Sequence, residues 1–115
     1  MTRRLDCKSK KLENHPLTVI ELDGQIDSAK GIDLLEEIAT AQDVEHVAIQ
    51  MEGVTYINSS GCGGLIALHH KMEGRGFRLF LVNPVGGVER VIKHVGCHKI
   101  LCLSKSLEEV IKEVG

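Results

Sequence analysis

Two serine hydroxyls and three glycines gather between residues 56 and 64, where the chain reads Tyr-Ile-Asn-Ser-Ser-Gly-Cys-Gly-Gly. The hydroxyls of Ser59 and Ser60 can cap a helix, accept a phosphoryl group or act as nucleophiles. At a helix N-terminus, free N–H groups and the helix dipole favour added negative charge. A phosphoryl group on Ser59 would bring about −1.5 to −2 charges and three acceptor oxygens. Helix capping by either serine is the more common use of such residues, and a phosphorylation switch at Ser59 is the sharper hypothesis.

A serine nucleophile is the third interpretation of this stretch. The residues around Ser59 do not form the G-x-S-x-G elbow of serine hydrolases, and none of the six histidines can be assigned as a base from sequence. The three glycines do not belong to a phosphate-binding loop, because the Lys and Ser/Thr that complete a P-loop are missing. No G-x-G-x-x-G with a downstream acid is present either. Close helix packing, or close approach of a partner's backbone, explains such small residues better. We therefore expect no enzyme and no cofactor.

Asp27 stands at a second transition, from a strand-like run to a helical pattern. In a parallel sheet the carboxyl ends of the strands lie at one edge, where ligands and partners usually bind. Asp27 and Ser59 are therefore expected to share that edge. The alternative is that Asp27 or Ser28 simply caps the next helix.

Four of the histidines fall in two small clusters in the sequence, His69-His70 and His94 with Cys97 and His98. Spacing of i, i+4 could bring His94 and His98 together on a helix, but Gly96 is expected to end the helix between them. No carboxylate set or further Cys/His pair completes either cluster. The sequence therefore predicts surface or internally satisfied histidines and no metal site.

The four cysteines show no C-x-x-C pair and no zinc-finger spacing, so a disulfide framework is not expected. Cys62 falls in the first turn of a predicted helix, where a thiol pKa can be lowered. The alternative is a small buried side chain that fills space.

The elements that must position these residues follow from hydrophobic periodicity. Weak alternation predicts an edge strand within residues 1–12, and Ser104 is expected to cap the last helix. Glu52-Gly53 is expected to break the third strand, leaving a short extended approach over 54–57. The other predicted strands cover 17–22, 44–51, 77–82 and 99–103, and the predicted helices cover 29–41, 59–72, 85–94 and the chain after 104.

The predicted order is β-β-α-β-α-β-α-β-α. Repeated βα units imply right-handed crossovers and a largely parallel sheet. We expect one α/β domain over residues 1–115, with a mostly parallel or mixed sheet of about five strands and about four helices packed over it. Aromatic residues make up only 3% of the chain, so the core must be aliphatic.

Composition limits the kinds of partner. The net charge of −2 argues against a general nucleic-acid or anionic-membrane binder. The scarce aromatics offer no stacking platform for single strands. No run approaches the ~18 apolar residues of a membrane span, and no signal peptide is evident. A cytoplasmic protein with reduced cysteines is expected.

Taken together, these features resemble a STAS domain, the anti-sigma factor antagonist family of bacteria. The resemblance covers nearly the whole chain. It is carried by Gly24-Gln25-Ile26-Asp27, the stretch from Tyr56 to Gly63, Gly74-Arg75-Gly76, Asn83-Pro84 and Val95-Gly96.

The resemblance implies a function. In the regulatory branch of the family, an anti-sigma kinase phosphorylates the first serine of a D-S-S-G-like segment, which here is Ser59. The unphosphorylated form binds the kinase and frees its sigma factor, phosphate blocks the contact, and a phosphatase restores it. The expected partner-contact residues are Asp27, Asn58, Ser60, Gly61, Cys62 and Gly63.

One residue departs from that pattern. Asn58 stands where the best-studied regulators carry Asp; Asn keeps the size and one acceptor but loses the charge. A second function therefore stays open, that of a non-phosphorylated interaction subunit, for example of a lipid-transport ABC complex. The identity of the partner and the oligomeric state also stay open.

Overall fold

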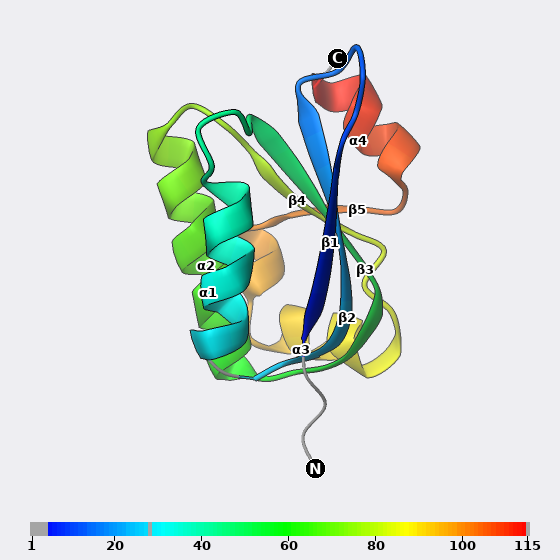
Figure 1. The fold of residues 1–115 in the computed structure, drawn as a ribbon. Helices are drawn as coiled ribbons and strands as arrows, with labels where there is room; N and C mark the ends of the chain where they lie inside the picture. The colour runs from blue at the N-terminus through cyan, green and yellow to red at the C-terminus, as the bar shows by residue number, and fades with distance from the viewer. Residues whose placement is uncertain (1–4, 28, 115) are drawn as a thin grey trace.

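The computed structural model describes residues 5–27 and 29–114, the side chains of residues 29–31 excepted. These residues form one five-stranded sheet and four helices (Figure 1). The strands are β1 (Asp6–Lys11), β2 (Leu17–Ile26), β3 (His46–Ile57), β4 (Leu79–Val82) and β5 (Cys102–Ser104). The helices are α1 (Ala29–Ala39), α2 (Ser59–Gly74), α3 (Gly86–His94) and α4 (Leu107–Val114), with a short 3₁₀ turn, η1 (Cys97–Lys99), after α3.

The strands lie in the sheet in the order in which they occur in the chain. β1 pairs antiparallel with β2, and the other three pairings are parallel. α1 and α2 cover one face of the sheet, and α4 lies on the other (Figure 1). The predicted element order, the mixed sheet and the aliphatic core are confirmed.

The middle of β3 and all of β4 are largely apolar, as expected where both faces of a strand are buried. Alternate residues of β3 and β4 point into two separate cores. The larger core, beneath α1, α2 and α3, receives Val47, Ile49, Met51, Leu79 and Leu81. The smaller core, beneath α4, receives Ala48, Phe80 and Val82.

The prediction that Glu52-Gly53 breaks the third strand is wrong. β3 continues to Ile57, and Gly53 pairs with Asp23 of β2. A Cβ at Gly53 would lie 2.1 Å from Asp23 Oδ1 and 2.7 Å from the carbonyl oxygen of Leu22. The glycine therefore lets two strands pass closely at an irregularity in their register, and it does not end the strand.

The prediction that Ser104 caps the last helix is also wrong. Ser104 ends β5, and α4 begins three residues later. The hydroxyl of Ser106 instead accepts a hydrogen bond from the Glu109 N–H at 3.3 Å. The prediction that Ser28 caps α1 falls outside the described residues.

None of the helices in the described part of the chain has the length and apolar character that crossing a bilayer requires.

Candidate functional site

The start of α2 is organised by Asn58. This residue precedes the helix with extended backbone angles, φ −120° and ψ −178°, and its Oδ1 accepts a hydrogen bond from the Gly61 N–H at 2.8 Å. Asn58 is thus the N-cap, and the prediction that Ser59 or Ser60 caps the helix is wrong. The cap position lies one residue before the first helical turn, and from there a short side-chain oxygen can reach the third helical N–H. Both serines are exposed on the first turn.

Asn58 also joins α2 to the neighbouring strand. Its Nδ2 donates a hydrogen bond to the backbone carbonyl of Asp27 at 3.4 Å, and its backbone N–H donates to the carbonyl of Ile26 at 3.4 Å. The side-chain amide therefore uses its acceptor for the helix and its donor for the end of β2. An aspartate could perform the first task but, when ionised, has no donor for the second.

Two glycines of the stretch allow α2 to pack closely. A Cβ at Gly61 would lie 2.2 Å from the carbonyl oxygen of Ile26, and one at Gly64 would lie 2.8 Å from Cγ1 of Ile32 on α1. Gly63 differs, because a Cβ there would meet no atom within 4 Å, and the residue is exposed. Packing within the described chain thus explains Gly61 and Gly64 but not Gly63.

Cys62 is an internal residue. Only 2% of its surface is exposed. Burial, reinforced by a hydrogen bond with Cys97, raises the pKa of the Cys62 thiol to about 12. The hypothesis of a lowered pKa is therefore wrong, because desolvation disfavours the thiolate more than the helix start favours it. The alternative, a small buried side chain, is confirmed.

Asp27 and Ser59 lie at the same edge of the sheet, as predicted. Ile26 and Ile57 are paired at the ends of β2 and β3, so the residues that follow them leave the sheet side by side. Asp27 and Asn58 are half-buried there, Ser60 and Gly63 are exposed, and Gly61 and Cys62 face inward. The predicted partner-contact residues thus divide into a surface set and an inner set that supports it.

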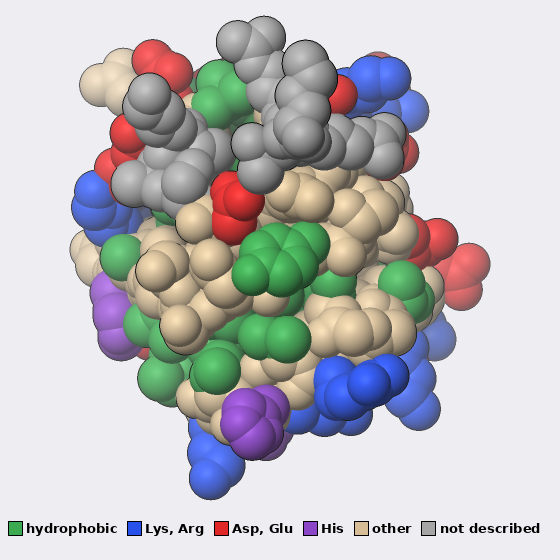
Figure 2. Space-filling view, turned by 90° about the horizontal axis from the view of Figure 1, so that it is seen from below, with side chains coloured by type: hydrophobic (Ala, Val, Ile, Leu, Met, Phe, Trp, Pro, Cys, Tyr) green, Lys and Arg blue, Asp and Glu red, His purple; other side chains and the backbone are tan. Residues whose placement is uncertain are grey.

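The face at this end of the molecule carries apolar surface. Hydrophobic side chains gather in its middle, and lysine and arginine side chains lie around several of its margins (Figure 2). Tyr56, the single tyrosine of the chain, is 46% exposed one residue before the end of β3.

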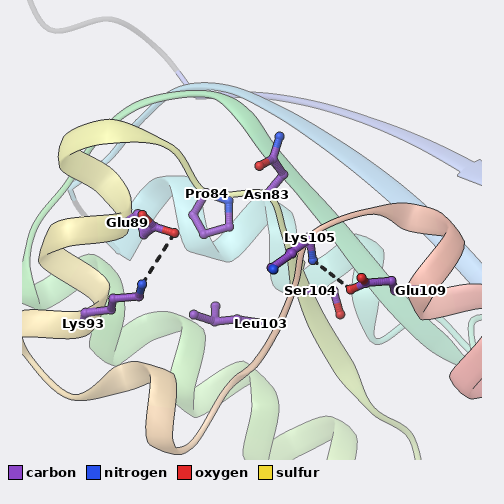
Figure 3. A pocket seen from close by; sticks show the side chains of 8 residues that line it. All are labelled: Asn83, Pro84, Glu89, Lys93, Leu103, Ser104, Lys105 and Glu109. Carbon is purple, nitrogen blue, oxygen red and sulfur yellow. Dashed lines mark hydrogen bonds and ion pairs between the residues drawn. The ribbon is translucent and has the colours of Figure 1, made fainter.

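A separate pocket of about 300 Å³ lies at the carboxyl ends of β4 and β5 (Figure 3). The turn Asn83-Pro84, α3 and the start of α4 line it, but Ser59 does not. Its charges are partly paired: Lys93 Nζ lies 3.7 Å from Glu89 Oε2, and Glu109 accepts a hydrogen bond from the Lys105 N–H at 3.2 Å. The sequence indicated the turn but not the pocket.

The structure offers no support for a hydrolase site. Among the described residues, no histidine is hydrogen-bonded to the Ser59 hydroxyl.

The two histidine clusters that the sequence indicated have different outcomes in the structure. Gly96 has a left-handed φ of 81°, and α3 ends at His94, so His94 and His98 do not share a helix face. His69 and His70 instead gather with Glu73, a carboxylate that the sequence interpretation overlooked.

Comparisons with known proteins agree with this fold. The model of the STAS domain family matches residues 8–110. An anti-sigma factor antagonist from Mycobacterium paratuberculosis has a TM-score of 0.78 at 19% identity, over 99% of this chain and 98% of that chain. A search of curated protein sequences found no match.

The anti-sigma factor antagonist SpoIIAA is similar to the chain in two forms. The unphosphorylated form has a TM-score of 0.75 at 22% identity, over 95% of this chain and 96% of that one. The phosphorylated form, from Bacillus, has a TM-score of 0.68 at 22% identity, over 96% of this chain and 100% of that one. At these identities the similarity shows a shared fold.

Proposed function

Because the chain belongs to the STAS domain family, we propose that it is an anti-sigma factor antagonist that binds an anti-sigma kinase and is switched off by phosphorylation of Ser59. The observation that carries the proposal is the exposure of Ser59 at the first residue of α2, where Asn58 has taken over the capping role. The Ser59 hydroxyl is therefore not needed to cap its own helix.

The first turn of α2 suits a phosphoryl group. Among the described residues, the N–H groups of Ser59 and Ser60 have no hydrogen-bond partner, as is usual for the first helical residues. A phosphate on Ser59 would lie close to these donors and to the positive end of the helix dipole. Because the chain has a net charge of −2, this phosphate would nearly double the net negative charge. The fold should therefore tolerate phosphorylated Ser59, while the charge of the surface around Ser59 changes strongly.

The unphosphorylated surface is proposed to contact the kinase through Asp27, Asn58, Ser60 and Gly63. Gly63 has open space around it, so a partner's backbone can approach the helix closely at this point. Gly61 and Cys62 act indirectly by holding the helix start against β2 and η1. Phosphate on Ser59 would oppose docking through charge repulsion and the cost of desolvating the dianion. A phosphatase would restore binding. The protein itself carries out no catalytic step.

The direct test uses the genome-neighbouring anti-sigma kinase of the GHKL type. The purified pair is incubated with Mg²⁺ and ATP, and intact mass is followed. Wild type and Ser60→Ala should each gain one phosphoryl group, and Ser59→Ala should gain none. Absence of phosphate on wild type, under conditions in which a known kinase–antagonist pair reacts, would count decisively against the proposal.

The second candidate function is a non-phosphorylated interaction subunit, for example of a lipid-transport ABC complex. Asn58 favours it, because this residue replaces the acidic side chain of the best-studied switches and is engaged in two structural hydrogen bonds. Gene neighbourhood separates the two candidates. Sigma factor and kinase genes support the switch, whereas permease and ATPase genes support the subunit.

A further inference from the structure

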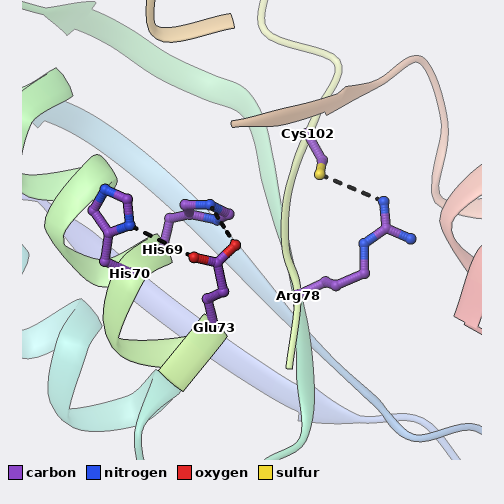
Figure 4. Close-up of polar contacts among 5 residues, drawn as sticks. All are labelled: His69, His70, Glu73, Arg78 and Cys102. Carbon is purple, nitrogen blue, oxygen red and sulfur yellow. Dashed lines mark hydrogen bonds and ion pairs between the residues drawn. The ribbon is translucent and has the colours of Figure 1, made fainter. Parts of the chain in front are cut away.

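Three potential metal ligands gather on the C-terminal half of α2 (Figure 4). His69 Nε2 lies 3.7 Å from Glu73 Oε2, and His70 Nδ1 lies 3.8 Å from Glu73 Oε1. One ligand atom from each residue can be chosen such that all three lie within 4.8 Å of one another. The cluster is about 15 Å along the helix axis from Ser59, so it is distinct from the proposed phosphorylation site.

The chemistry of this donor set points to a transition metal. Two imidazoles and one carboxylate are the ligands that zinc uses in open, three-residue sites, whereas Mg²⁺ and Ca²⁺ prefer oxygen ligands alone. Ligand bonds of about 2.0–2.2 Å in a tetrahedron place neighbouring donor atoms about 3.3–3.6 Å apart. The two histidine–glutamate separations, which run to different oxygens of Glu73, exceed that spacing by a few tenths of an ångström. The full set of three ligand atoms lies within 4.8 Å, so side-chain rotations must draw the atoms together around an ion.

Of the three potential ligands, the His69 side chain is held by its buried surroundings, whereas the side chains of His70 and Glu73 are exposed and free to rotate. The His69 side chain is only 13% exposed, and its Nδ1 is buried without a hydrogen-bond partner among the described residues. Nε2 is therefore the ring atom of His69 available to an ion. The side chains of His70 and Glu73 are 61% and 66% exposed and can rotate toward it. The neighbouring cation Lys71 is paired with Glu36 of α1.

We propose that His69, His70 and Glu73 form a binding site for a transition-metal ion, with Zn²⁺ as the fitting ion and with at least one coordination position left for water or a partner's side chain. The ion ties together residues one helical turn apart. Because the unfolded chain does not hold these three ligands in place, binding stabilises the folded state by mass action.

Calorimetric titration of untagged, metal-free protein with zinc chloride tests the site, with a phosphine reductant keeping the cysteines reduced. Wild type should bind one Zn²⁺ per chain. His70→Ala and Glu73→Gln should each lower the affinity by about tenfold or more, the scale on which even outer-shell partners act. His94→Ala, which changes another exposed histidine, is the matched control and should leave the affinity unchanged. Both ligand positions are exposed, so the variants should fold, as circular dichroism would verify.

Two further measurements exclude binding elsewhere. At the same zinc concentration, the melting temperature should rise more for wild type and His94→Ala than for Glu73→Gln. Cobalt(II) should bind without the intense thiolate charge-transfer absorption that ligation by the half-buried Cys7 or Cys102 would produce. The proposal is overturned by failure of wild type to bind zinc at equimolar concentration, by equal affinity in the ligand variants, or by thiolate absorption that persists in Glu73→Gln.

Discussion

The side-chain amide of Asn58 donates a hydrogen bond to the backbone carbonyl of Asp27 at 3.4 Å, across the ends of two adjacent parallel strands. The same amide caps α2 through its oxygen. The residue that distinguishes this chain from the best-studied phosphorylation switches therefore holds the helix start in place. It leaves the hydroxyl of Ser59 exposed beside it.

Asn58→Ala should destabilise the protein more than Ser59→Ala. The first change removes the cap, at a cost of roughly 0.5–2 kcal/mol, and also a hydrogen bond worth about 0.5–1.5 kcal/mol. The second removes neither, so its effect should lie within about 0.5 kcal/mol of zero. Urea unfolding followed by circular dichroism measures both. A larger decrease in the free energy of unfolding for Ser59→Ala than for Asn58→Ala would show that the serine, and not Asn58, caps the helix.

Asn58→Asp should separate the two roles of that side chain. The aspartate still caps and gains a favourable interaction with the helix dipole of about 0.3–1 kcal/mol, but it loses the donor to Asp27, worth about 0.5–1.5 kcal/mol. The free energy of unfolding should therefore stay within about 1 kcal/mol of wild type. If this variant is phosphorylated faster at Ser59 in the kinase assay, Asn58 limits the rate of the switch. An unchanged rate would assign Asn58 a structural role alone.

Charge at Ser59 should control partner binding. Ser59→Ala is expected to keep kinase affinity and to remain bound in the presence of ATP, because it cannot be phosphorylated. Ser59→Asp should weaken binding through charge and desolvation. Isothermal titration against the kinase measures both, and Asp33, an exposed carboxylate on α1, provides a control through Asp33→Asn. Wild-type affinity for Ser59→Asp would remove the support for charge-based switching.

Alanine at Gly61 and at Gly63 should have opposite effects. A Cβ at Gly61 would overlap the backbone carbonyl of Ile26 at 2.2 Å, so overpacking should cost about 1–3 kcal/mol. A Cβ at Gly63 meets open space, and alanine should stabilise the helix by about 0.5–1 kcal/mol. Thermal unfolding distinguishes the two. If Gly63 serves the partner, Gly63→Ala should also weaken kinase binding despite the gain in stability, and unchanged binding would place the contact elsewhere.

His46 should make the folded state sensitive to acid. Its Nδ1 accepts a hydrogen bond from the Arg78 N–H at 2.9 Å, and burial is the main reason that its pKa lies below the usual value. Protonation is therefore less favourable in the folded than in the unfolded chain. The contribution of neutral His46 to the free energy of unfolding is complete above about pH 6.5. It is lost as the pH falls through the folded-state pKa of His46.

Replacement of His46 by glutamine should flatten this dependence. Urea unfolding at a series of pH values below neutrality should show a smaller fall in the free energy of unfolding for His46→Gln than for wild type. His98→Gln, at an exposed position, is the matched control. An identical slope in wild type and His46→Gln would assign the acid sensitivity to other groups.

Much of the fold could be predicted from local pattern. Period-two and helical spacing of apolar residues placed the strands and helices, because each element buries one or both faces and its sequence must match. The βα order required a parallel sheet, and a parallel sheet brings the residues after β2 and β3 to one edge. Asp27 and Ser59 were assigned to a shared edge on that reasoning, and their types and positions also supported the family resemblance.

The contacts within the site were decided by tertiary structure. Whether Asn58 or a serine caps α2 depends on which oxygen reaches the Gly61 N–H once the backbone has turned. Likewise Gly53 continues a strand because Asp23 of the adjacent strand passes close to it, and the Glu73 carboxylate lies within 3.8 Å of ring nitrogens of His69 and His70. Apolar periodicity records which face of an element is buried. Which atoms then come within bonding distance depends on how the folded elements and their side chains pack.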